Sequence, residues 1–235
     1  MIIKKRSPFR LIPYKLDAEQ TLFLDGIRYS IEMADISYTQ LRRTLLYITK
    51  NGQSQKLPGT NTVKALLSAW SIIDNINRLR NLLTNMRGIK KGSPGRVIFL
   101  KNTNEVETLR NVIQHLNKRA VVDELLQTNS AALGSLTWSI PSNAKKGYIY
   151  SCYLRPGTLK SSTAPFKIHV GRTRYPVDEI TLSIGSNEVC ISEVMDSLKK
   201  LVLLIENNLK AQFEGLPPGN IDTYMCNEIY TGEIE

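Results

Sequence analysis

The chain has 235 residues and a formal net charge of +10 at pH 7, from 31 Lys and Arg against 21 Asp and Glu. Hydrophobic residues make up 42% and charged residues 22%, so the chain can bury a sizeable core and wholesale disorder is excluded. The longest aliphatic run, residues 201–205, is too short to cross a bilayer, and the basic amino terminus lacks the apolar segment of a secretory signal. We therefore expect a soluble, cytoplasmic protein without a membrane partner.

The cysteine and histidine content predicts no metal site and no cofactor. Cys152, Cys190 and Cys226 are far apart and form no C-x-x-C pair, which is typical of reduced thiols. The two histidines, His115 and His169, are also distant from each other. His169 has the features of an ordinary strand residue.

Basic residues are concentrated in the first half of the chain. Residues 1–119 hold 21 Lys and Arg against 8 acids, whereas residues 120–235 hold 10 against 13. The interval between Asp74 and Glu105 contains no acid and the following bases: Arg78, Arg80, Arg87, Lys90, Lys91, Arg96 and Lys101. Such a run repels itself unless an anion neutralises it, so it indicates phosphate binding. The alternative is a solvated segment that serves solubility.

Apolar residues at three- and four-residue spacing predict three helical regions before residue 130. The first covers about 17–49, as one long helix or two joined ones, and the second covers 62–86. Residues 87–96 contain several Gly and Pro and predict a basic loop. The third helix is expected over 104–127, with Asn104 as N-cap and Glu107 completing a capping box.

The pattern changes after residue 130. Five short β-like runs are separated by turn residues, at 137–140, 148–154, 166–170, 180–184 and 189–191. A last helix follows over about 192–213, with Ser192 as N-cap.

We therefore expect a mainly α fold, α+β overall: a helical bundle of residues 1–130 plus 192–214, with a small antiparallel β unit (131–191) inserted before the last long helix. Residues 215–235 carry four acids and no base, which predicts a loosely attached acidic tail.

One constellation has the residue types of a metal-free phosphodiesterase. Arg110 offers a planar, permanently charged fork for a phosphate, His115 can transfer a proton near neutral pH, and Asn111 can orient either group. On one continuous helix, Asn111 and His115 share a face, while Arg110 lies about 140° from His115. A two-fold dimer that apposes two such helices would complete the site more easily than one chain. The alternative is that these are ordinary surface residues of a bundle helix.

These residues resemble the HEPN superfamily (higher eukaryotes and prokaryotes nucleotide-binding). The stretch Trp70–Arg80, followed by a basic loop and then Leu109–His115, carries the resemblance, and Arg110, Asn111 and His115 match its R-x4–6-H signature. The likeness covers roughly residues 17–130, with the last long helix as a closing member. It implies a bundle that dimerises through the motif helix and acts as a metal-independent endoribonuclease. Many members are toxins or defence effectors, which extends the expectation to an antitoxin or other regulatory partner.

Further residues are candidates for supporting roles in that activity. Asp74 and Arg78 lie on a polar face of the second helix and would support Arg110, or would simply pack polar contacts within the bundle or dimer. RNA would be bound by basic residues of the acid-free interval: Arg87, Lys90, Lys91, Arg96 and Lys101.

Two other functions stay open. The same bundle could be a non-catalytic module that binds RNA, a nucleotide or a protein, with the β unit as its contact surface. Tyrosines of 148–153 could stack bases there, although strands favour tyrosine in any case. The third alternative is a structural or regulatory dimer whose basic half holds an acidic protein.

Overall fold

The computed structural model describes residues 1–51, 59–86, 91–142, 148–157, 175–219, 222–224 and 226. Its elements follow in the order η1 (Pro8–Arg10), α1 (Ala18–Asn51), α2 (Gly59–Asn85), α3 (Pro94–Asn102), α4 (Asn104–Gln114), α5 (Arg119–Gln127), β1 (Ser135–Pro141), β2 (Ile149–Leu154), β3 (Asp178–Ile184), β4 (Asn187–Cys190) and α6 (Ile191–Phe213). The chain is mainly helical with one small antiparallel sheet, which confirms the expected α+β class.

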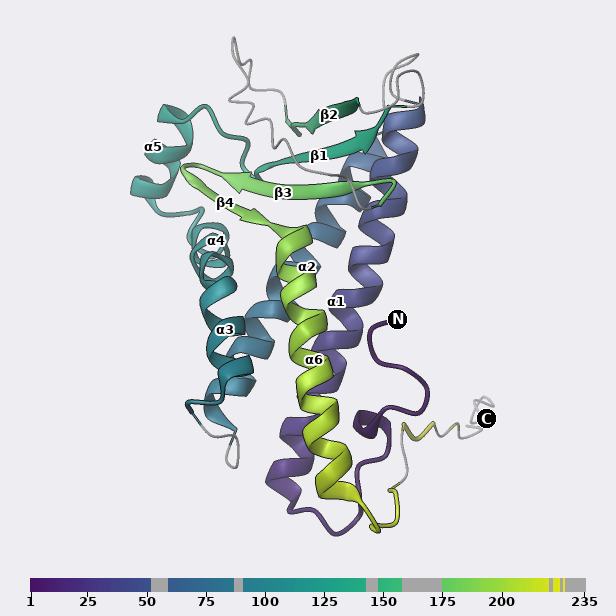
Figure 1. Cartoon of the computed structure of the whole chain (residues 1–235). Helices are drawn as coiled ribbons and strands as arrows, with labels where there is room; N and C mark the ends of the chain where they lie inside the picture. The colour runs from purple at the N-terminus through teal and green to yellow at the C-terminus, as the bar shows by residue number, and fades with distance from the viewer. Residues whose placement is uncertain are drawn as a thin grey trace, which may run out of the picture.

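The long helices form the body of the molecule, and the sheet lies across one end of it (Figure 1). Helix α1 is a single helix of 34 residues. Its buried positions recur every three or four residues, as at Ile27, Ile31, Ala34, Leu41 and Leu45, which gives one continuous apolar stripe. Helix α2 packs along α1, α6 also contacts α1, and α3 packs on α6.

The predicted third helix over 104–127 is wrong in its continuity. Helix α4 ends at Gln114, and α5 begins at Arg119 after a turn in which the Lys118 amide donates to the His115 carbonyl at 2.8 Å. The two helices bury their apolar residues against different neighbours. Helix α4 packs on α2 and β4, whereas Leu125 of α5 lies near the β3–β4 turn at Gly185. One straight helix cannot serve both surfaces, so the chain turns between them.

The predicted basic loop over 87–96 is also partly helical. Helix α3 begins at Pro94, with Ser93 as its N-cap. Proline fits this first position because its missing N–H would have had no helical partner there. Residues 87–90 lie outside the described part of the chain.

Both predicted N-caps are wrong by one or two residues. Thr103 occupies the N-cap position of α4, and Asn104 is the first residue of the helix. The Thr103 hydroxyl makes no capping bond, because it donates to the Phe99 carbonyl at 2.7 Å and accepts from Arg80 at 2.8 Å. Cys190 precedes α6 as its N-cap. The Ser192 hydroxyl instead accepts from the Ile180 amide at 3.0 Å and lies 3.2 Å from the Tyr38 hydroxyl, so it joins α1, β3 and α6.

The sheet has the strand order β2-β1-β3-β4, with every pair antiparallel. Its four strands coincide closely with the predicted runs 137–140, 148–154, 180–184 and 189–191. The β3–β4 turn passes through Gly185, whose φ of 59° favours glycine. The fifth predicted run, 166–170, and His169 within it lie outside the described residues.

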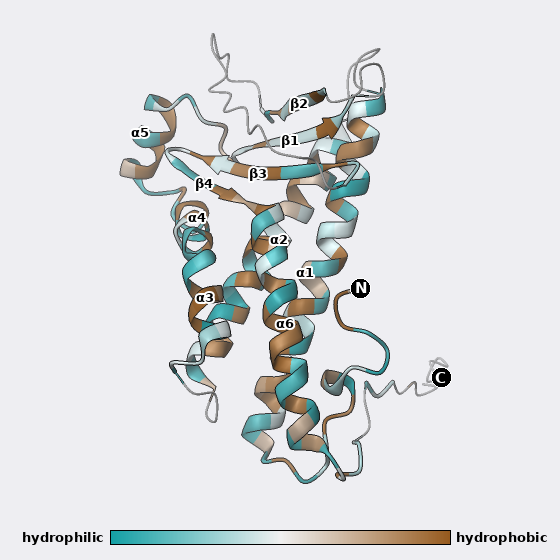
Figure 2. Ribbon diagram, in the orientation of Figure 1, coloured by the Kyte–Doolittle hydropathy of each residue, from teal (hydrophilic) through white to brown (hydrophobic). Residues whose placement is uncertain are grey.

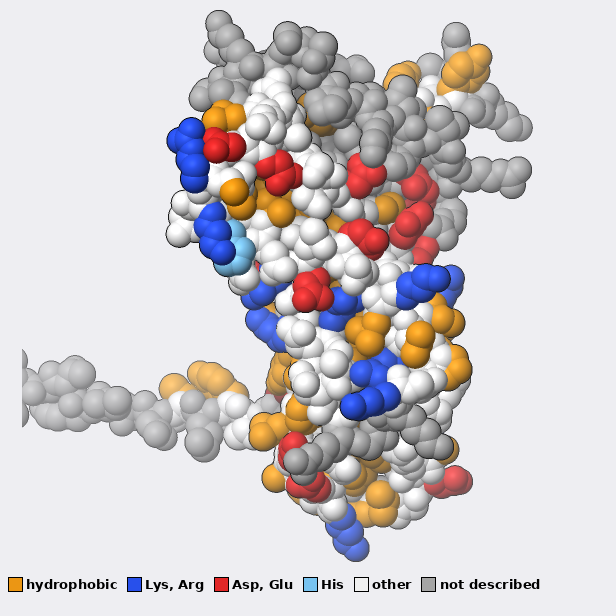
Figure 3. All heavy atoms as spheres, turned by 90° about the vertical axis from the view of Figure 1, so that its left-hand side faces the viewer, with side chains coloured by type: hydrophobic (Ala, Val, Ile, Leu, Met, Phe, Trp, Pro, Cys, Tyr) orange, Lys and Arg blue, Asp and Glu red, His pale blue; other side chains and the backbone are white. Residues whose placement is uncertain are grey.

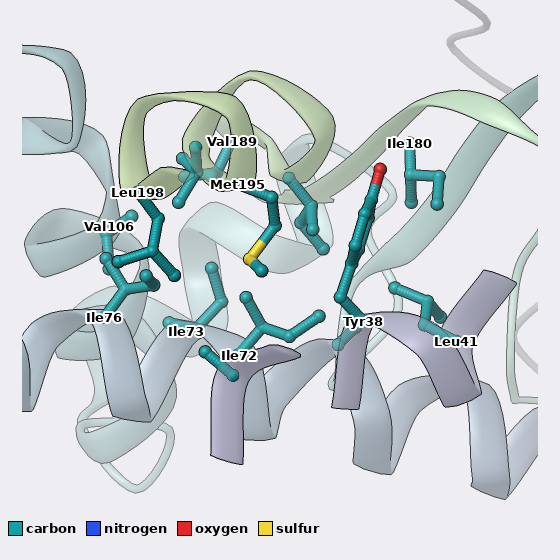
Figure 4. Close-up of a cluster of buried hydrophobic side chains, with 14 of the residues drawn as sticks. Tyr38, Leu41, Ile72, Ile73, Ile76, Val106, Ile180, Val189, Met195 and Leu198 are labelled. Carbon is teal, nitrogen blue, oxygen red and sulfur yellow. The ribbon is translucent and has the colours of Figure 1, made fainter. Parts of the chain in front are cut away.

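Bundle and sheet share one hydrophobic core. Figure 4 shows side chains from α1, α2, α4, β3, β4 and α6 meeting in a single cluster, and brown apolar positions line the facing sides of the ribbons in Figure 2. Met195 and Tyr38 lie near its middle, between the helices and Ile180 of the sheet. The sheet therefore holds the helix ends in place. Within the described residues, no helix combines the length and the apolar character needed to cross a membrane.

Candidate functional site

Helix α4 places Arg110 at the edge of its contact with α2. Val106 and Leu109 are fully buried, which fixes the helix rotation and leaves Arg110 on the flank. The Arg110 Nε donates to Asp74 Oδ1 of α2 at 3.1 Å, and Nη1 donates to Gln114 Oε1 at 3.1 Å. The structure therefore brings Arg110 into contact with Asp74, one of the two residues proposed to support it.

Around this pair lies an open groove of about 560 Å³, which we call the Arg110 groove. It is formed by α2, α4 and one residue of α1, and its lining residues are Phe23, Asp74, Asn77, Arg78, Asn81, Leu82, Asn85, Arg110, Ile113 and Gln114. Asp74 is the single acid among them, against two arginines. Arg78 is exposed and its Nη1 donates to Asn75 Oδ1 at 3.4 Å. Guanidinium and amide donors at such a surface suit a phosphate group.

The Arg110 side chain is 32% exposed and keeps part of its fork free. Among the residues that the structure describes, Nη2 has no hydrogen-bond partner. Asp74 and Gln114 hold the other two nitrogens, so the guanidinium is oriented before any ligand binds. Such preorganisation lowers the cost of ordering the side chain on binding.

The other two motif residues do not line the groove. Asn111 is exposed on the next face of α4, and His115 is an exposed residue that caps the helix, with its amide donating to the Val112 carbonyl at 3.2 Å. The expectation that all three lie on one helix is therefore wrong for His115. In one chain the arginine faces α2, whereas the asparagine and the histidine face solvent.

The predicted RNA-binding bases fall into different groups. Lys91 and Lys101 are exposed, while Arg87 and Lys90 lie outside the described residues. Arg96 is only 8% exposed, and it donates to the Leu83 carbonyl at 3.0 Å and to the Lys91 carbonyl at 2.5 Å. It therefore ties α3 to α2 and is not free to bind RNA.

Arg80, from the same basic run, is also buried. It donates to the Leu100 carbonyl at 2.5 Å and to the Thr103 hydroxyl at 2.8 Å, and it pairs with Glu107 at 3.3 Å. Two charges of the run are thus structural: Arg96 ties α3 to α2, and Arg80 holds the α3–α4 junction. On the face that carries these helices, basic side chains gather near the middle and acidic ones lie toward the sheet (Figure 3).

Two groove residues, Gln114 and Asn85, were missed from the sequence, whereas Asn77 and Asn81 belong to the polar face of the second helix that was predicted with Asp74 and Arg78. Gln114 orients Arg110, and Asn77, Asn81 and Asn85 form a polar row along α2. Each set has a four-residue spacing, which places its members on one helix face. That spacing is a usable signal in the sequence.

Within the described residues, no group of three or more His, Cys, Asp and Glu side chains is arranged to hold a metal ion. No family model, no curated protein and no solved structure matches the chain.

Proposed function

We propose that the protein is a metal-independent endoribonuclease of HEPN type. We further propose that it acts in defence or as a toxin, as many members of that family do. The observation that supports this most is the Arg110 guanidinium, which is oriented by Asp74 and Gln114 at a groove and has Nη2 free among the described residues. RNA is then the substrate and the cytoplasm the site of action. The resemblance of the motif supplies the reaction class.

In this mechanism the ribose 2′-oxygen attacks the adjacent phosphorus. Arg110 binds the nonbridging oxygens, whose negative charge rises in the pentacoordinate transition state. His115 moves the proton that leaves the 2′-hydroxyl or reaches the departing 5′-oxygen, and Asn111 orients the phosphate or the ribose. One fragment ends in a 2′,3′-cyclic phosphate and the other in a 5′-hydroxyl. Exposed bases such as Lys91 and Lys101 hold the flanking backbone.

The proposed enzyme is a dimer. Because Arg110 faces α2 while Asn111 and His115 face solvent, one chain does not gather the motif around one phosphate. A two-fold contact between the carboxyl ends of two α4 helices would bring the histidine of one copy toward the arginine of the other. An antitoxin or other regulatory protein would act by covering this surface.

The test is RNA cleavage by the full chain in excess EDTA, with the fragment ends mapped. We expect cleavage by the wild type and at least a hundredfold loss for His115→Ala and Arg110→Ala, in line with removal of a general acid–base or an oxyanion donor. Arg119→Ala is the matched control, because Arg119 is an exposed arginine that pairs only locally with Asp123 among the described residues. Equal activity of all four proteins would show that the motif is not the site.

The placement of His115 outside the groove favours a second candidate, a non-catalytic RNA- or nucleotide-binding module. Such a module would bind RNA without turnover, and His115→Ala would leave its affinity unchanged. Lys91→Ala and Lys101→Ala would weaken it at moderate salt, because each removes one phosphate contact. Binding of an acidic protein but of no RNA would instead indicate the regulatory dimer.

A further inference from the structure

A second arginine, buried and outside the Arg110 groove, also contacts an acid from a distant part of the chain. Arg28 of α1 is 2% exposed and is the largest fully buried side chain among the described residues. A guanidinium keeps its charge at any physiological pH, so burial of this kind is costly unless an anion is present. The anion at Arg28 comes from far along the sequence, 194 residues away, on Asp222.

Asp222 binds Arg28 as a small ligand would. The Arg28 Nη2 donates to Oδ1 at 2.6 Å and Nη1 donates to Oδ2 at 3.4 Å, so the contact is bidentate. The Tyr29 hydroxyl donates to the same Oδ1. The Asp222 side chain nevertheless stays 51% exposed, so the chain around it does not enclose the carboxylate.

The segment that brings Asp222 is attached at a few points. Pro218 forms an isolated bridge with Pro13, and the Gly219 amide donates to the Ile12 carbonyl at 2.8 Å. A Cβ at Gly219 would lie 2.7 Å from that carbonyl oxygen, so the close approach depends on glycine. The acidic tail expected to be loose is thus held, in its described part, by backbone bonds and by Asp222.

A cavity of about 350 Å³ remains beside this ion pair. Its walls combine aromatic and apolar side chains with polar ones, and its residues are Phe9, Ile12, Pro13, Tyr14, Thr21, Asp25, Arg28, Tyr29, Gly219 and Asp222. We call it the Arg28 pocket. Its volume is within the range of small-molecule sites. Among the described residues, none lines both this pocket and the Arg110 groove.

The buried arginine also has unused bonding capacity. Arg28 Nε is buried and has no hydrogen-bond partner among the described residues, and Asp25 Oδ1 lies 3.9 Å from it, beyond hydrogen-bond distance. A buried N–H without a partner is rare in folded proteins and costs free energy. Asp222 therefore satisfies only part of what this guanidinium can bind.

We propose that the Arg28 pocket is a second ligand site, which binds the oxyanion of a small molecule, a phosphate or a carboxylate, and that Asp222 occupies it as an internal ligand. The Arg28 fork and the Tyr29 hydroxyl bind the oxyanion, and the aromatic walls contact the rest of the molecule. A tethered carboxylate competes at an effective concentration in about the millimolar range. A free ligand must displace it, and displacement releases the tail.

The test is calorimetric titration of the full chain with inorganic phosphate, adenosine 5′-monophosphate and acetate as three separate probes. The Asp222→Ala variant removes the internal ligand, and Glu214→Ala is the matched control, because it removes an exposed acid just before the tail. If Asp222 is bound to Arg28 in about 90–99% of molecules, Asp222→Ala binds the probe roughly 10–100-fold more tightly than the wild type. Phosphate and acetate then distinguish the two oxyanion sources.

The double variant Tyr29→Phe with Asp222→Ala tests binding without disturbing the fold, because Tyr29 is exposed and its hydroxyl can be removed without a loss of core packing. Loss of its hydroxyl should weaken the gained affinity several-fold without lowering the melting temperature of the double variant below that of Asp222→Ala. The proposal is overturned if Asp222→Ala binds none of the three probes more tightly than the wild type, or if Glu214→Ala gains as much.

Discussion

The buried Arg80 offers the sharpest test of how the motif helix is held. Replacing it with Met keeps most of the side-chain volume but removes the donors to the Leu100 carbonyl at 2.5 Å and the Thr103 hydroxyl at 2.8 Å. Hydrogen bonds from a charged group contribute about 1.5–3 kcal/mol each, and the apolar Met recovers part of the loss, so we expect the free energy of unfolding to fall by about 3 kcal/mol. The Glu107 pair adds little, since that carboxylate is exposed.

Urea denaturation measures this effect, and Arg78→Met is the matched control on the same helix. Arg78 is exposed and makes one long contact, at 3.4 Å to Asn75, so its replacement should change the free energy by no more than about 0.5 kcal/mol. For a chain of this size, the Arg80 variant should also melt roughly 6–12 °C lower. Equal midpoints for the two variants would refute the claim that the Arg80 guanidinium holds the α3–α4 junction.

Three further predictions follow from single contacts. Asp74→Asn removes the acid from the Arg110 groove, so RNA affinity measured by filter binding should rise. Single-turnover cleavage should slow, because Arg110 is less firmly oriented. An unchanged affinity and an unchanged cleavage rate would contradict the role of Asp74. The hydrogen bond from Arg28, followed by that from Tyr29, lowers the pKa of Asp222 below its ordinary 3.8. This contact therefore stabilises the docked tail above pH about 4 and is lost as the pH falls through the lowered pKa. The amide NMR shifts of the tail should stay constant down to pH 4, and release of the tail near pH 5 would disprove this. Burial raises the pKa of Cys190 to about 11, whereas Cys226 is exposed, so a thiol reagent at pH 8 should label Cys226 first; mass spectrometry identifies the labelled site, and faster labelling of Cys190 would contradict its burial.

Long periodic segments could be predicted from the sequence because their burial repeats within each segment. Helices α1, α2 and α6 begin and end within about three residues of the predicted bounds, since many turns of the same apolar stripe specify one face. The cap of α6 could not be predicted in this way, because it depends on a contact between distant segments. The Ser192 hydroxyl accepts from the Ile180 amide of β3, and Cys190 takes the N-cap position.

The basic run shows a limit of charge counting. Arg80 and Arg96 have the same charge as Lys91 and Lys101, yet the two arginines are buried and bind backbone carbonyls. Which of the bases is buried depends on where α3 packs on α2. That packing cannot be predicted from the sequence of the run. An arginine fork suits several carbonyls at once, whereas a lysine is more easily solvated. This difference makes burial of Arg80 and Arg96 feasible, but it does not decide which base is buried, because Arg78 of the same run is an exposed arginine.

The two ion pairs at the candidate sites differ in how much of each could be predicted from the sequence. Asp74 and Arg110 are 36 residues apart. Both lie on helices whose apolar faces were predicted, so the sequence indicates on which face of its helix each residue lies. Arg28 and Asp222 are separated by 194 residues, and the first looks like any basic residue on an amphipathic helix. Its charge is paired by Asp222, which lies on a tail without a periodic pattern. A charge that is paired by a distant, weakly patterned segment is therefore the kind of feature that requires the three-dimensional structure, and it is where we propose that an external anion competes with the protein's own.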